Sequence, residues 1–245
     1  MGIYTSIFAA IIVLLASFVR AASGFGYALL ATPLLTLVME AKSVVVLNMI
    51  LGSLSNILVF WHTRRYIDLK RVVVLGLGSI FGIPAGTYLL VKLEPSIIKL
   101  AIAIVVIPFS ILLLLGHSHR FKRDTLGCAV AGFLSGLLGG STGLGGPPVV
   151  LFLINQGLTP QMFVGTLAAY FLFNGAILVA TFTFLGMVTA DILIKVAILL
   201  PTLWLGSYIG VKMLPRINTV VFKKIASAIV AATAVIIVAS IVMDM

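Results

Sequence analysis

The chain has 245 residues, of which 62% are hydrophobic and 9% are charged, and its mean hydropathy is +1.28. A soluble domain carries charge on about a quarter of its residues, so this composition excludes that class and indicates a protein of the lipid bilayer. The net charge of +10 comes from basic residues in short segments between apolar runs. That placement is typical of residues that orient a membrane protein, and it argues against a nucleic-acid partner.

The first apolar segment, residues 3–39, is too long for one ordinary span and is interrupted by SGFG at residues 23–26. We expect mature protein here, because the segment has no preceding basic residue and no convincing signal-peptide cleavage site. Arg20 lies three residues before the interruption. An arginine at membrane depth costs about 2.5–3.5 kcal/mol on insertion scales, so it marks a functional site unless its side chain reaches the interface. The sequence leaves open whether the Arg20 side chain faces a functional site or reaches the interface.

Unbroken apolar runs and one further broken run make up the rest of the chain. Each unbroken run is long enough, at about 1.5 Å per residue, to cross roughly 30 Å of hydrocarbon as a helix. The second broken run, residues 125–158, contains GGSTGLGG at residues 139–146. We expect a first transmembrane repeat at residues 1–116, a basic cytoplasmic linker at 117–124 and a second repeat at 125–245. The unbroken spans are predicted at residues 42–63, 72–91, 97–115, 162–185, 192–213 and 225–243.

The two breaks indicate an internal duplication. SGFG begins at residue 23 and the similar TGLG begins at residue 142, which is 119 positions later. Asn56 falls close to the corresponding place of Asn174, and KLAIAIVV from residue 99 resembles KIASAIVA from residue 224. The chain therefore predicts a duplicated unit of about 120 residues.

Loop charges indicate that the two copies have opposite orientations. Residues 63–71 carry four basic side chains and the corresponding loop 186–195 carries one, whereas the next pair of loops, 91–99 and 212–224, reverses this bias. Equivalent loops therefore lie on opposite sides of the membrane. We predict an all-α polytopic membrane protein of two inverted-topology repeats, each a glycine-broken helix hairpin plus three transmembrane helices. Both termini are expected outside the cytoplasm, and re-entrant and twice-crossing broken segments both stay open.

A glycine-rich break frees backbone N–H and C=O groups that hydrocarbon cannot satisfy, so it must be buried in protein or line a wet cavity. Paired breaks in inverted repeats are typical of secondary transporters, and the N-terminus of a half-helix suits an anion. Tight packing or a hinge is the alternative explanation of the glycines. The chain has six acidic residues, and all lie at or near predicted loops or the terminus. No carboxylate is expected at mid-membrane to bind a cation, which favours anion transport over cation transport.

Other chemistry finds little support in the sequence. The three histidines show no metal-binding spacing, and the single cysteine, Cys128, excludes an internal disulfide and a cysteine cluster. We therefore expect that the protein is not an enzyme and binds no metal ion and no cofactor. Asn56 and Asn174 are mid-span amides, for which substrate contact and helix-to-helix hydrogen bonding are equally open.

The segments ASGFGYALLATPLL at residues 22–35 and GLLGGSTGLGGPPVVLFL at residues 136–153 resemble the sulfite exporter TauE/SafE family. The resemblance covers essentially the whole chain. It implies export of sulfite or small organosulfur anions such as sulfonates, and by position it points to both breaks. Together with the polar residues discussed above, the candidate substrate-binding residues are Arg20, Ser23, Gly24, Gly26, Asn56, Gly140, Ser141, Thr142, Gly143, Gly145, Gly146, Pro147 and Asn174.

The leading hypothesis is a multi-pass secondary transporter of the cytoplasmic membrane that exports such an anion by alternating access. Its expected partners are the anionic substrate and the lipid bilayer, and the sequence leaves a homodimer open. The alternatives are an anion channel on the same scaffold and a non-transporting membrane assembly or sensor subunit.

Overall fold

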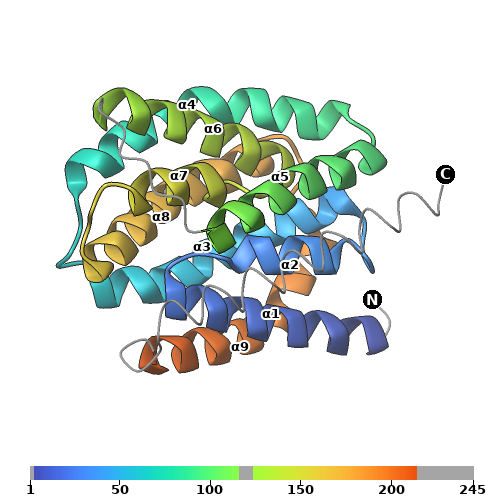
Figure 1. Ribbon diagram of the computed structural model, residues 1–245. Helices are drawn as coiled ribbons and strands as arrows, with labels where there is room; N and C mark the ends of the chain where they lie inside the picture. Colours follow the sequence, from blue (N-terminus) through green and yellow to red (C-terminus); the bar gives the residue numbers. More distant parts are fainter. Residues whose placement is uncertain (1–2, 116–123, 214–245) are drawn as a thin grey trace.

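The computed structural model describes residues 3–115 and 124–213, and every element in these ranges is an α-helix (Figure 1). Six of the described helices, α1, α3, α4, α6, α8 and α9, are long and apolar enough to cross a membrane. The prediction of an all-α polytopic membrane protein is thus confirmed. The helices are α1 (Ile3–Ser23), α2 (Tyr27–Leu35), α3 (Ala41–Thr63), α4 (Leu69–Lys92), α5 (Pro95–Leu115), α6 (Asp124–Thr142), α7 (Gly146–Ile154), α8 (Pro160–Phe184) and α9 (Ala190–Met213).

The predicted unbroken runs between residues 42 and 213 correspond to α3, α4, α5, α8 and α9. The predicted span at residues 225–243 lies outside the described residues, as does the basic linker apart from Asp124, which begins α6. Both predicted interruptions are present, between α1 and α2 and between α6 and α7.

The second interruption is shorter than the predicted residues 139–146, because α6 continues to Thr142 and only residues 143–145 are non-helical. Two contacts explain the difference. The Ser141 hydroxyl donates a hydrogen bond of 2.8 Å to the Leu137 carbonyl one turn earlier, so it stays within helical geometry. Gly140 packs against α4, where an added Cβ would lie 2.8 Å from the Thr87 backbone nitrogen.

Helices α4 and α6 lie side by side along one edge of the molecule (Figure 1). Glycines at every fourth position of each helix face the backbone of the other, and contacts advance in the same direction along both, so the helices are parallel. Small residues at this spacing let two helix backbones approach closely without side chains between them. The glycines are Gly78, Gly82 and Gly86 of α4 and Gly132, Gly136 and Gly140 of α6.

Helices α1 and α9 form a second parallel pair at the opposite edge (Figure 1). Gly206 faces Leu14 and Ser17 of α1, and an added Cβ at Gly210 would lie 2.5 Å from the Phe18 carbonyl oxygen. Each long helix that precedes a break is therefore packed closely against a helix from the other half of the sequence.

Helices α3 and α8 cross between these two pairs. Gly175 of α8 contacts Ser53 near the middle of α3, while Gly165 near the start of α8 packs on the Thr63 carbonyl at the end of α3. The two helices therefore run antiparallel. The middle of the molecule is the most enclosed part, and the apolar residues Val44, Val45, Leu47 and Leu51 of α3 are all buried there.

We expect Gly82→Ala to destabilise the protein by about 1–3 kcal/mol, because the new methyl group would overlap the Phe133 carbonyl and force α4 and α6 apart. Val73→Ile on the same helix adds one carbon to a side chain that is 58% exposed, so it should change stability by less than about 0.5 kcal/mol. Equilibrium unfolding of the purified variants measures the difference. Equal stability of the two variants would contradict the close backbone contact.

Candidate functional site

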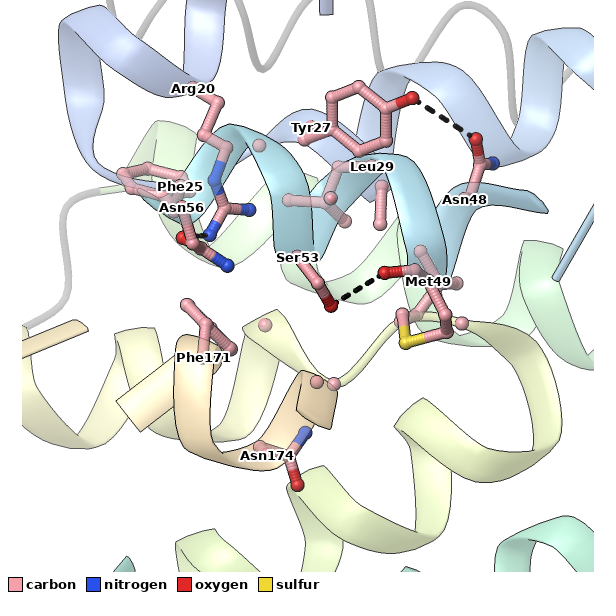
Figure 2. Close-up of a pocket in the computed structure, with 18 of the residues that line it drawn as sticks. Arg20, Phe25, Tyr27, Leu29, Asn48, Met49, Ser53, Asn56, Phe171 and Asn174 are labelled. Atoms are coloured by element: carbon pink, nitrogen blue, oxygen red, sulfur yellow. Dashed lines mark hydrogen bonds between the residues drawn. The ribbon is translucent and has the colours of Figure 1, made fainter. Parts of the chain in front are cut away.

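A cavity of about 60 Å³ lies where both helix breaks meet the middle of α3 and α8 (Figure 2). Residues 25–29 line it from the first break and residues 143–147 from the second, and the guanidinium of Arg20 enters from the end of α1. A water molecule occupies about 10–15 Å³ on this measure, so the cavity has room for a handful of water-sized groups. It is therefore the size of a small ion with its oxygen atoms.

Both breaks are built by the same local device. At the first, the Ser23 hydroxyl lies 2.9 Å from the Val19 carbonyl oxygen and accepts a hydrogen bond of 3.3 Å from the Phe25 N–H. At the second, the Thr142 hydroxyl donates to the Leu138 carbonyl (2.8 Å) and accepts from the Leu144 N–H (3.3 Å). These hydroxyls hold the chain at the end of one helix as it turns toward the next.

A glycine follows each hydroxyl in a left-handed conformation, with φ of 81° at Gly24 and 76° at Gly143. Only glycine adopts this region without steric cost, which explains why the chain turns at these two positions. Gly26 also has a positive φ of 101°, whereas the corresponding Gly145 is at −67°. The two breaks thus share their first turn and differ in their second.

The N-termini of α2 and α7 both border the cavity. Neither has a side-chain cap, so the first-turn N–H groups of each helix lack partners within the helix. In α7, Pro147 and Pro148 stand in this turn and carry no N–H, so α7 offers fewer donors than α2. The richer set of backbone donors therefore lies at the first break.

Arg20 is only 7% exposed and lines the cavity, so its side chain points into the protein and not outward to its surroundings. Its Nη2 donates to the Asn56 Oδ1, its guanidinium carbon lies 5.3 Å from the centre of the Phe171 ring, and its Nε has no hydrogen-bond partner. The ion pairs among the described residues join Arg71 to two aspartates and Lys195 to a third, and none involves Arg20. The charge of Arg20 is thus met by a neutral amide and an aromatic face.

Asn174 lies on the opposite, α8 side of the cavity and is 3% exposed. Its Oδ1 is buried without a hydrogen-bond partner. Under the predicted duplication, the counterpart of Arg20 is Gly139, 119 positions later, and an added Cβ there would lie 3.7 Å from the Asn174 Nδ2. The position expected for a second guanidinium thus holds a glycine beside Asn174.

The structure gathers most of the sequence-predicted site residues around the cavity. Those that line it are Arg20, Gly26, Asn56, Gly143, Gly145, Gly146, Pro147 and Asn174. Those that do not line it are Ser23, Gly24, Gly140, Ser141 and Thr142. The second set shapes or packs the breaks: its hydroxyls bond to backbone carbonyls, Gly24 packs on Val164, and Gly140 packs on α4.

Several lining residues were not predicted from the sequence. Asn48 accepts a hydrogen bond from Tyr27 (3.4 Å) and donates one to Thr32 (3.1 Å). Asn48 and Gly52 lie eight and four residues before the predicted residue Asn56, on the same face of α3. That four-residue spacing could have identified both as lining residues from the sequence. The apolar lining residues Phe25, Leu29, Met49, Leu144 and Phe171 carry no comparable signal in a chain this hydrophobic. Among the described residues, no group of three or more His, Cys, Asp or Glu could hold a metal ion.

Gly143→Ala should lower stability by about 1–2 kcal/mol, because alanine resists the left-handed conformation, although its Cβ would meet Thr32 and Val45 only at 3.7 Å, an ordinary van der Waals distance. Gly146→Ala is the matched control. It also lines the cavity, its added Cβ would lie 3.9 Å from Phe171, and its helical position should gain about 0.4–1 kcal/mol. Equilibrium unfolding of the two purified variants compares them, and equal effects would show that the turn at Gly143 is not required.

A family model described as "Sulfite exporter TauE/SafE" matches residues 9–237, which is nearly the whole chain. No curated protein and no solved structure gives a significant match. The family match agrees with the apolar helices and with the paired glycine breaks that meet at one cavity. This chain is a multi-pass membrane protein that belongs to the sulfite exporter TauE/SafE family of transporters.

Proposed function

We propose that this protein exports sulfite or a small organosulfur anion such as a sulfonate across the cytoplasmic membrane, by alternating access around the cavity between the helix breaks. The observation that carries this proposal is the buried charge of Arg20, which has no carboxylate partner among the described residues. A buried charge is costly unless it is paired. A bound anion supplies the missing partner.

The cavity offers an anion three kinds of favourable contact. Arg20 provides the charge, the first-turn N–H groups of α2 provide hydrogen-bond donors, and the amide of Asn174 provides a further polar group on the α8 side. Asn56 orients the guanidinium of Arg20 through its hydrogen bond. Glycines 143, 145 and 146 let the anion approach the backbone of the second break.

The packing of the helices supports two inverted repeats, residues 1–116 and 125–245. Helices α3 and α8 occupy the same place in the two halves and run antiparallel, as inverted copies require. The two outer helix pairs fit the same pattern. Helix α1, the first of its half, packs on α9, the fourth of the other half, and α6, the first of the second half, packs on α4, the fourth of the first. Transporters of this architecture move one repeat against the other around a central site.

The direction of transport follows from the membrane potential. An inside-negative potential favours outward movement of an anion by about 2.3 kcal/mol per charge per 100 mV. Export therefore needs no second ion, and the absence of acidic residues around the cavity is consistent with this.

The first test is sulfite efflux from liposomes that contain only this protein, with the membrane potential set on both sides and a sulfonate as competitor. We expect saturable, potential-sensitive efflux with counterflow. Flux without saturation or counterflow would favour an anion channel. A correctly inserted protein that neither moves nor binds any anion would favour the assembly or sensor subunit.

Arg20→Gln should reduce transport at subsaturating sulfite by about 30-fold or more, because loss of a buried charged partner costs about 2 kcal/mol or more. Arg20→Lys keeps the charge and is the control, with a smaller loss. Thermal unfolding of both variants separates binding from folding. Normal affinity in Arg20→Gln would contradict the assignment of Arg20 to the anion.

Asn56→Asp should abolish anion transport while leaving the protein as stable as the wild type or more so. The new carboxylate would accept the same hydrogen bond from Arg20 and cancel its charge, which leaves no place for the negative charge of the substrate. Asn56→Ala removes the hydrogen bond without adding charge and should keep more activity. Efflux assays and thermal unfolding of both variants provide the comparison, and normal transport by Asn56→Asp would refute the pairing of Arg20 with substrate.

A further inference from the structure

The number of formal charges around the cavity bears on which anions it accepts. Of the described residues that line it, Arg20 is the only one with an ionised side chain. The other polar side chains in the lining are neutral amides and hydroxyls, namely Tyr27, Asn48, Ser53, Asn56 and Asn174. The side chains therefore supply one positive charge and no negative charge.

The helix ends add donors but no formal charge. The N-termini of α2 and α7 border the cavity, whereas the C-terminal residues Ser23 and Thr142 of α1 and α6 do not line it. Helix N-termini carry a partial positive charge of about +0.5, together with N–H donors. The formal charge that the described residues present to a ligand is therefore that of Arg20 alone.

Among the described residues, the second half of the chain supplies no further cation to the cavity. Gly139 stands where the duplication would place a second arginine, and Asn174, one residue from the position expected for the counterpart of Asn56, has an Oδ1 without a hydrogen-bond partner. A symmetric site would have carried two guanidinium groups and matched a dianion. The duplicated backbone here holds a single charge.

We infer that the cavity accepts one negative charge at a time, so that the transported species is a monoanion, either hydrogensulfite or a singly charged sulfonate, and not the sulfite dianion or sulfate. This inference rests on the proposed export function. A dianion would leave one buried negative charge without a partner, which the surrounding apolar side chains of Phe25, Leu29 and Phe171 cannot stabilise.

The choice of species has a consequence for proton movement. Hydrogensulfite carries its own proton, so its export removes one acid equivalent together with the sulfur anion. In the part of the chain that the structure describes, no carboxylate or histidine lines the cavity to hold a transported proton. The substrate itself then carries the proton, and the protein needs no separate proton relay.

The test compares two substrates of the wild-type protein in liposomes. Methanesulfonate has one negative charge at every pH used, whereas sulfite changes from hydrogensulfite to the dianion as the pH rises through neutrality. Fluxes are measured at equal subsaturating concentrations and equal membrane potential, with the pH the same on both sides. The readout is the ratio of sulfite flux to methanesulfonate flux, because a titration of the protein that affects both fluxes cancels.

We expect this ratio to fall about tenfold for each tenfold fall in the hydrogensulfite fraction. Sulfate should compete with methanesulfonate at least about 100-fold more weakly than unlabelled methanesulfonate does, since its second charge lacks a partner. A ratio that stays constant or rises with pH, or equal competition by sulfate, would overturn the monoanion inference and leave the export function intact. Absence of flux for both substrates would instead refute the export function.

Discussion

A guanidinium group buried in an apolar helix bundle and held by a neutral amide is the constraint on which the site depends. The Asn56 oxygen and the Phe171 ring stabilise the charge of Arg20 without cancelling it, and no described carboxylate approaches. An arginine paired with a carboxylate would form a structural ion pair, and an arginine at the membrane interface would help to fix the position of its helix in the membrane. This arrangement keeps a positive potential at membrane depth, which hydrocarbon alone could not support.

The helix breaks can lie at this depth because close helix pairs enclose them. The long helix before each break is packed against a helix of the other half of the sequence, α1 against α9 and α6 against α4, with glycines that bring the backbones together. The backbone of residues 24–26 and 143–145 is thereby surrounded by protein. The N–H groups of Gly24, Phe25, Gly143 and Leu144 have hydrogen-bond partners within the breaks, and residues 25–26 and 143–145 border the cavity. Backbone that lipid could not satisfy becomes tolerable in this setting.

The sequence predicted what depends on composition and period, and it could not show which of two available roles a side chain takes. The described spans, the two breaks and the position of Arg20 as a candidate followed from hydropathy, glycine spacing and the cost of a charge in lipid. The hydroxyls of Ser23, Ser141 and Thr142 were predicted to contact substrate, but each bonds to a carbonyl of its own helix. Gly140 likewise packs on α4. A sequence shows that a serine or glycine is present, whereas only packing shows which neighbour it meets.

The two breaks share a backbone turn and differ in the chemistry of the residues around it. Ser23 with Gly24 and Thr142 with Gly143 share a contact to the preceding helical turn, an N–H donor two residues later and a left-handed glycine, while Ser23 also contacts the Phe25 carbonyl at 2.6 Å. The first break has in addition a guanidinium and a helix whose first-turn N–H groups lack partners within the helix. The second has Gly139 and a helix whose first turn contains two prolines. In the proposed export mechanism the attraction for an anion is therefore concentrated at the first break. The second break would contribute mainly the shape of the cavity, since its glycines leave room beside the first break.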